Sequence, residues 1–156
     1  MKKIITLILF PLISFSQGVM ITEIADPNDN EFARYVEIYN SGDDQSMSDY
    51  YLIRWTNGNA NPTNSSAISL ATACGGTLYR FQYCIISNKT ASTFAGNYGI
   101  YSDYNAGTGG SADSNGDDNL AIVTSAGGSF NSASYTLIDV FGNAGVDGTG
   151  TWHEFE

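Results

Sequence analysis

The loop "DSNGDDN" has the residue types and the spacing of a calcium-binding turn. Asp113, Asn115 and Asp117 stand at alternate positions, with Gly116 before the third. Oxygen ligands at positions i, i+2 and i+4 open the calcium loop of an EF-hand. That loop also needs a Gly at position 6 and a bidentate Glu at position 12, where this chain has Thr124. The pattern therefore favours a solvated acidic turn over a calcium site.

A calcium ion at this loop would need further oxygen ligands from elsewhere in the chain. The turn "DPNDN" offers two of them, Asp26 and Asp29. We expect no cofactor other than this ion, if it binds. Its candidate ligands within the loop are Asp113, Asn115, Asp117 and Asp118.

Two carboxylates in strand-like runs, Glu23 and Glu37, raise the alternative of glycosidase chemistry, which needs two carboxyl groups that converge in a cleft. Local sequence alone does not place them in one cleft. The simpler expectation is an outward cross-strand ion pair between Glu37 and Arg54. A Ser–His–Asp hydrolase is disfavoured because His153 is the sole histidine and no G-x-S-x-G motif occurs. We therefore predict no catalytic residue.

Aromatic side chains are the other candidates for contacting a ligand. The chain has 10 Tyr, 8 Phe and 2 Trp, and "NYGIYSDY" places Tyr98, Tyr101 and Tyr104 in a loop-like region. Exposed tyrosines can stack on sugars or on the side chains of a partner. Tyrosines also fill the edges and corners of β-sandwiches, and the sequence favours that structural role.

The two cysteines, Cys74 and Cys84, are separated by a Gly-Gly pair and a strand-like run. Glycines directly after Cys74 would let the chain reverse and return Cys84 beside it. A zinc site is less favoured, since it needs three or four ligands. We predict an intramolecular disulfide without a redox-catalytic role, because there is no C-x-x-C motif.

The beginning of the chain has the pattern of a secretory signal. Lys2 and Lys3 precede an apolar run, and small residues follow at Ser14 and Ser16. We expect a signal peptide over residues 1–16, cleavage before Gln17, and an exported protein that is extracellular, at the cell surface or periplasmic. No later segment is long and apolar enough to span a membrane.

The charge balance limits the class of partner. The chain carries 6 basic and 16 acidic residues. Such a surface repels phosphate backbones, so nucleic-acid binding through phosphate contacts is disfavoured.

Short apolar runs separated by Asn-, Asp- and Gly-rich turns predict an all-β domain. In "RYVEIYN", alternation turns Val36 and Ile38 toward the core and Tyr35, Glu37 and Tyr39 outward. Only "NKTASTFAGNYG" suggests a helical turn. The runs predicted as strands cover residues 19–25, 34–40, 51–55, 67–70, 79–87, 119–124 and 136–142. Seven or eight such strands favour an antiparallel β-sandwich.

The order of these runs resembles the bacterial lamin tail domain. "ITEIADP" and "YVEIYNSGDDQSMSDYYLIRW" resemble the I-x-E-I strand, the E-x-Y-N strand and the D-L-S-G-[WY]-x-L segment that open that family. Met47, Ser48, Tyr50 and Leu52 occupy the last set of positions, while Asp49 replaces the usual Gly. "YCIISN", "GDDNLAIVTSAGG" and "LIDVFG" resemble its later strands. The resemblance covers Val19 to about Trp152.

The resemblance implies an immunoglobulin-like β-sandwich over residues 18–156 that serves as a secreted, non-catalytic binding or accessory module. Because such domains are expected to run on past "TWHEFE", it also implies a truncated domain or the leading part of a longer protein. The expected partner is an unidentified protein or a surface glycan. The alternatives are a carbohydrate- or calcium-dependent adhesion module and, third, a small secreted hydrolase.

Overall fold

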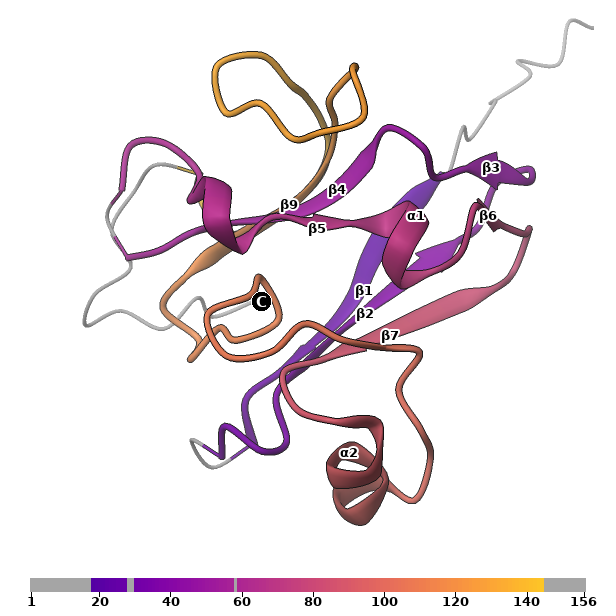
Figure 1. Cartoon of the computed structure of the whole chain (residues 1–156), viewed down its shortest axis with the longest axis vertical. Coiled ribbons are helices and arrows are strands. Elements are labelled where there is room, and N and C mark those ends of the chain that lie inside the picture. Colours follow the sequence, from indigo (N-terminus) through magenta and orange to yellow (C-terminus); the bar gives the residue numbers. More distant parts are fainter. Residues whose placement is uncertain (1–17, 28–29, 58, 145–156) are drawn as a thin grey trace, which may run out of the picture.

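The computed structural model describes residues 18–27, 30–57 and 59–144, and these residues form a mostly β structure (Figure 1). Among the described residues, no helix has the length and apolar composition needed to cross a bilayer. The expected signal segment and His153 lie outside the described residues. The strands are β1 (Val19–Ala25), β2 (Tyr35–Asn40), β3 (Gln45–Ser46), β4 (Tyr50–Trp55), β5 (Ile68–Ser69), β6 (Thr77–Leu78), β7 (Tyr83–Ser87), β8 (Tyr104–Asn105), β9 (Asn119–Thr124) and β10 (Thr136–Phe141). The helical segments are the 3₁₀ turn η2 (Asn64–Ser66), α1 (Leu70–Ala73) and α2 (Ala91–Tyr98).

The strands form two four-stranded sheets and one small two-stranded sheet. Their orders are β1-β2-β7-β8, β10-β9-β4-β5 and β3-β6. Neighbouring strands pair antiparallel except β7 and β8, which pair in parallel. The predicted all-β class with antiparallel sheets is therefore confirmed.

The main hydrophobic cluster contains side chains from both four-stranded sheets. Val36 and Ile38 of β2 are fully buried in it, together with Leu52 of β4 and Ile122 of β9. The predicted register of β2 is thus confirmed for its inward side chains. Since apolar burial is the main favourable term in folding, this shared cluster is what holds the sheets together.

Tyr35 points away from the main core, as expected, but its side chain is buried and not exposed to solvent. Helix α2 covers that end of the outer face, and Tyr35 packs edge-on against Phe94 and Tyr98. The helix confirms the predicted helical turn. It begins after Thr90, whose hydroxyl accepts a bond from a backbone N–H of the first turn, and ends at Gly99 with φ of 75°.

The predicted strand over residues 79–87 begins later than expected, at Tyr83. Residues 79–82 form a turn in which the Gln82 N–H donates to the Tyr79 carbonyl at 3.0 Å. Within it, Phe81 has φ of 63°, a conformation that few bulky residues adopt. The left-handed backbone at Phe81 interrupts the strand, although the Phe81 N–H and the Gln82 carbonyl still bond to Asn40 of β2.

The predicted disulfide between Cys74 and Cys84 is confirmed, with Cα atoms 5.5 Å apart. Cys74 caps the C-terminus of α1, and the buried Cys84 lies on β7. The bridge therefore ties α1 to the middle of the first sheet. Gly75, with φ of 83°, makes the predicted reversal after Cys74.

Candidate functional site

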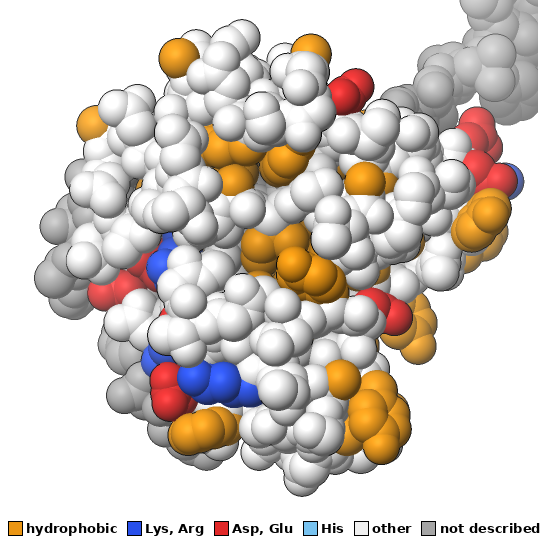
Figure 2. Space-filling model, viewed as in Figure 1, with side chains coloured by type: hydrophobic (Ala, Val, Ile, Leu, Met, Phe, Trp, Pro, Cys, Tyr) orange, Lys and Arg blue, Asp and Glu red, His pale blue; other side chains and the backbone are white. Residues whose placement is uncertain are grey.

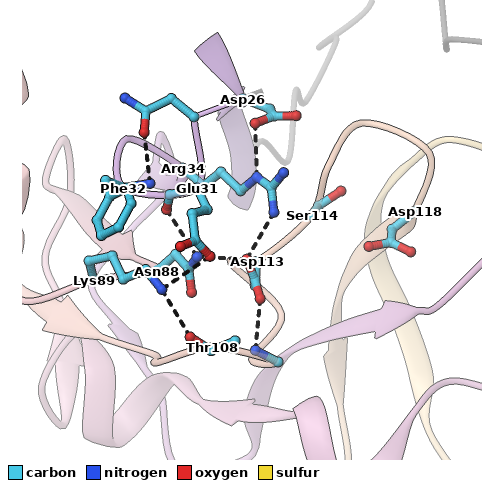
Figure 3. A network of polar contacts seen from close by, with 12 residues as sticks. Asp26, Glu31, Phe32, Arg34, Asn88, Lys89, Thr108, Asp113, Ser114 and Asp118 are labelled. Atoms are coloured by element: carbon cyan, nitrogen blue, oxygen red, sulfur yellow. Dashed lines mark hydrogen bonds and ion pairs between the residues drawn. The ribbon is translucent and has the colours of Figure 1, made fainter. Parts of the chain in front are cut away.

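Asp113 lies at the centre of a polar network where three loops meet at one end of the sheets (Figure 3). Its Oδ1 accepts hydrogen bonds from Arg34 Nη1 at 3.1 Å and Asn88 Nδ2 at 2.6 Å. Its Oδ2 accepts from the Gly109 N–H at 2.8 Å, and its backbone carbonyl accepts from Arg54 Nη1 at 2.6 Å. One carboxylate thus joins the loop after β8 to the segments that flank β2 and β7.

Arg34 joins two acidic loops through its guanidinium. Its Nε donates to Asp26 Oδ1 at 2.8 Å, while the side chain remains only 12% exposed. Burial on its own lowers the pKa of Arg34, but the hydrogen bonds to Asp26 and Asp113 outweigh it, and the pKa is raised. The guanidinium therefore stays charged and fixes both carboxylates in place.

A second ion pair lies deeper, between Arg54 of β4 and Asp118. Arg54 Nη1 is 3.1 Å from Asp118 Oδ2, and the two side chains are 10% and 3% exposed. The Asn57 N–H also donates to Asp118 Oδ1 at 2.9 Å. Burial raises the pKa of Asp118, and nearby Asp117 adds to this, although Asn57 and Arg54 act in the opposite direction.

The expected Glu37–Arg54 ion pair is wrong. The two residues lie in different sheets, and Glu37 Oε1 instead accepts from the Thr22 hydroxyl at 2.7 Å. Arg54 is buried, and a buried charge requires a partner, which Asp118 supplies. Glu23 and Glu37 are neighbours across β1 and β2, where Glu23 is exposed and Glu37 is half-buried.

The structure gives two of the four candidate calcium ligands in the loop other partners. Asp113 and Asp118 bind arginines, as described above, and Asn115 is exposed. Asp117 Oδ1 is buried and makes no hydrogen bond. Within the described ranges, no group of three or more His, Cys, Asp or Glu side chains has the arrangement of a metal site. Asp26 joins the network through Arg34, while Asp29 lies outside the described residues.

The network anchors the glycine-rich segment 107–110. Arg54 Nη2 donates to the Gly109 carbonyl at 3.3 Å, and Lys89 Nζ donates to Thr108 Oγ1 at 3.0 Å. Lys89 also lies 3.3 Å from Glu31 Oε2, so its charge is paired. At Gly110 an added Cβ would lie 2.9 Å from the Ala106 side chain, so only glycine fits this tight turn.

The anchored segment forms one wall of an open groove of about 550 Å³. We name this the hydroxyl groove. It is lined by residues 65–69, Thr72, Tyr104, Ala106 and residues 108–110. Figure 2 shows this face hollowed near its middle, with hydrophobic side chains at the floor and uncharged atoms around most of the rim.

The three candidate tyrosines do not form one surface. Tyr98 packs on Phe94 and donates its hydroxyl to the Ala33 carbonyl at 2.8 Å. Tyr101 is 73% exposed, and Tyr104 lines the hydroxyl groove while packing against the main core. Only Tyr104 therefore belongs to a groove with other candidate contacts.

An exposed aromatic group that the sequence analysis did not single out lies at the β6–β7 turn. Tyr79, Phe81 and Tyr83 are 58%, 61% and 57% exposed, and we name them the aromatic patch. Their alternation in "YRFQY" is the available signal in the sequence, but it lies within the run 79–87 that is predicted as one strand. The ion pair of Arg54 also has a signal in the sequence. Arg54 is a charged residue within the apolar run "YLIRW", and a charge on a buried strand must be paired.

No protein-family model and no curated protein matches this sequence. The buried ion pairs hold the loop of residues 107–118 in one conformation, and beside that loop lies an uncharged, open groove. The arrangement is suited to presenting a preformed surface.

Proposed function

We propose that this chain is an exported binding module with an immunoglobulin-like β-sandwich of lamin-tail type, which contacts a protein partner through the aromatic patch. The shared core of the two four-stranded sheets supports the sandwich. Met47 and Leu52, which occupy the leucine positions of the resemblance, are fully buried. Among the described non-glycine residues, only Asn57 and Phe81 have positive φ, so Asp49 does not adopt a left-handed backbone that would require glycine. Aspartate in place of the usual Gly is therefore compatible with the resemblance.

The observation that carries the binding function is the exposure of three large aromatic side chains on one short turn. Large apolar patches are unusual on a monomer surface, and aromatic residues are enriched where proteins bind one another. Tyrosine supplies a large contact area for little loss of side-chain freedom. The patch therefore offers the apolar anchors that a protein interface needs.

The backbone holds the patch in a fixed shape. The Phe81 N–H donates to the Asn40 carbonyl at 2.7 Å, and the Arg80 N–H donates to Asp44 Oδ1 at 2.9 Å. The Arg80 guanidinium lies over the Phe81 ring, 4.6 Å from its centroid. A left-handed φ at Phe81 costs free energy, and a binding role for its exposed ring would account for a bulky residue at this position.

The test uses the exported chain, labelled with a fluorophore, and intact cells of the organism that produces it. We expect saturable binding that is lost when the cells are first treated with protease. The variant Tyr79→Ser/Phe81→Ser/Tyr83→Ser should bind far more weakly. The matched control is Leu137→Ser/Val140→Ser, which removes exposed apolar side chains from the edge strand β10 and should bind normally. Binding that survives protease, or that the patch variant retains, would refute the proposal.

Export is tested separately. Mass spectrometry of the secreted protein should show a chain that begins at Gln17, in its free or pyroglutamate form. An intact Met1 on the extracellular protein would contradict a cleaved signal peptide.

A further inference from the structure

The hydroxyl groove has two walls that come from different sheets. One wall contains residues of η2 and β5 and Thr72 of α1, and the other contains Tyr104 of β8, Ala106 and residues 108–110. The walls are joined by Ser111, whose N–H and hydroxyl donate to the Ser66 carbonyl at 3.0 and 2.7 Å. The groove volume of about 550 Å³ lies within the range of small-molecule sites.

The lining of the groove is neutral, although the chain has a net charge of −10. None of the groove residues, all of which belong to the described part of the chain, is an acid or a base other than the phenol of Tyr104. The nearest cation that contacts the lining, Lys89 at Thr108, is already paired with Glu31. The lining therefore offers no charged side chain that could pair with a charged ligand, and this favours an uncharged one.

Three lining hydroxyls are available for a ligand. Those of Ser65, Ser69 and Thr72 make no hydrogen bond to another described residue. Each hydroxyl can both donate and accept, which matches the hydroxyl groups of a sugar. Tyr104, which lies opposite on β8 and packs on the core, adds an aromatic surface of the kind that contacts the apolar side of a sugar ring.

We propose that the hydroxyl groove binds a neutral oligosaccharide. Ser65, Ser69 and Thr72 bond the sugar hydroxyls, and Tyr104 packs on a ring. The inference goes beyond the proposed function, because it assigns a glycan ligand to a second surface that shares no residue with the aromatic patch.

The buried ion pairs make this groove a preformed site. Asp113 and Arg54 fix the Gly109 backbone, so the wall of residues 107–110 does not need to become ordered when the ligand binds. Preorganisation of this kind saves the entropy cost of ordering a loop. The ionic network and the groove therefore belong to one functional unit.

The experiment is isothermal titration calorimetry of the exported chain with xylo-, cello-, malto- and chito-hexaose and, as a charged probe, hexagalacturonate. We expect at least one neutral hexaose to bind and the charged probe to bind more weakly. Tyr104→Ala should weaken that binding about tenfold. Thr72→Trp should abolish it, because Thr72 is an exposed residue of α1 at the rim and indole would fill the groove without altering the core.

The control is Tyr101→Ala, which removes a tyrosine that is 73% exposed and outside the groove, and which should leave sugar binding unchanged. No binding by any neutral hexaose, or full binding by a folded Thr72→Trp variant, would overturn the inference. Binding of an uncharged Ser/Thr-rich decapeptide in place of sugars would overturn it as well. The triple variant of the aromatic patch should retain sugar binding, so the failure of one surface is distinguishable from the failure of the other.

Discussion

Replacing Asp113 with Ala removes the acceptor that joins three loops. Arg34 and Asn88 lose a bond to Oδ1, and the Gly109 N–H loses its bond to Oδ2. Arg34 keeps Asp26 as a partner, so its charge is not left alone. Breaking a buried ion pair by removing one partner costs about 3–5 kcal/mol. Because the guanidinium retains Asp26, we expect Asp113→Ala to lower the free energy of unfolding by about 2–4 kcal/mol.

A urea titration followed by far-ultraviolet circular dichroism measures this change. For a chain of this size, the loss corresponds to a midpoint lower by about 1–2 M urea with the slope unchanged. The matched control is Asp43→Ala, an exposed aspartate that should change stability by no more than about 0.5 kcal/mol. If both variants unfold at the wild-type midpoint, the network does not contribute to the free energy of unfolding. That result would refute the claim that the network anchors the loop.

Three further predictions concern the core, the disulfide and the second ion pair. Val36→Asp should prevent folding because it buries an unpaired charge between the sheets. Glu37→Gln should change the free energy of unfolding by about 0.5 kcal/mol or less. Reversed sensitivities of the two variants in a denaturant titration would contradict the inward and outward register of β2. Replacing Cys74 and Cys84 by Ser opens a bridge across a sequence separation of 10. The change should lower the free energy of unfolding by about 2–3 kcal/mol and the melting temperature by about 10 °C, and reductant should have no effect on the variant. Equal melting temperatures of the two proteins would argue against a stabilising bridge. Folding raises the pKa of Asp118, so its contribution to stability is present below the ordinary pKa of 3.8 and is lost as the pH rises through the raised value. The free energy of unfolding of the wild type, relative to that of Asp118→Asn, should therefore fall over that pH interval. A rise would show that folding lowers the pKa instead.

Much of the fold follows from local sequence. Alternation and turn residues predict β1, β2, β4, β7, β9 and β10 because each is a run of apolar residues bounded by Asn, Asp or Gly. The two-residue strands β3, β6 and β8 carry no such pattern, since their pairing depends on contacts made by the rest of the sheet. The Cys74–Cys84 bridge was predictable because its two glycines make a short closure feasible.

The candidate site was less predictable because its partners are far apart in sequence. Asp113 and Arg34 are separated by 79 positions, and Arg54 and Asp118 by 64. Local spacing favours a solvated acidic turn, with Asp113 as a candidate calcium ligand and Asp118 as a residue that could complete the shell, while the fold pairs both with arginines. Exposure of the aromatic patch is likewise set by a turn within a strand-like run, where Phe81 takes a backbone conformation that its residue type disfavours.

In the proposed function, an exported module binds a protein partner through Tyr79, Phe81 and Tyr83. The most direct measurement is the ratio of dissociation constants on intact cells between the Tyr79→Ser/Phe81→Ser/Tyr83→Ser variant and the Leu137→Ser/Val140→Ser control. Interface anchors contribute about 2 kcal/mol or more each when truncated, and their effects overlap, so a ratio of about 100 or greater is predicted. A ratio near one, with both variants folded, would contradict the claim.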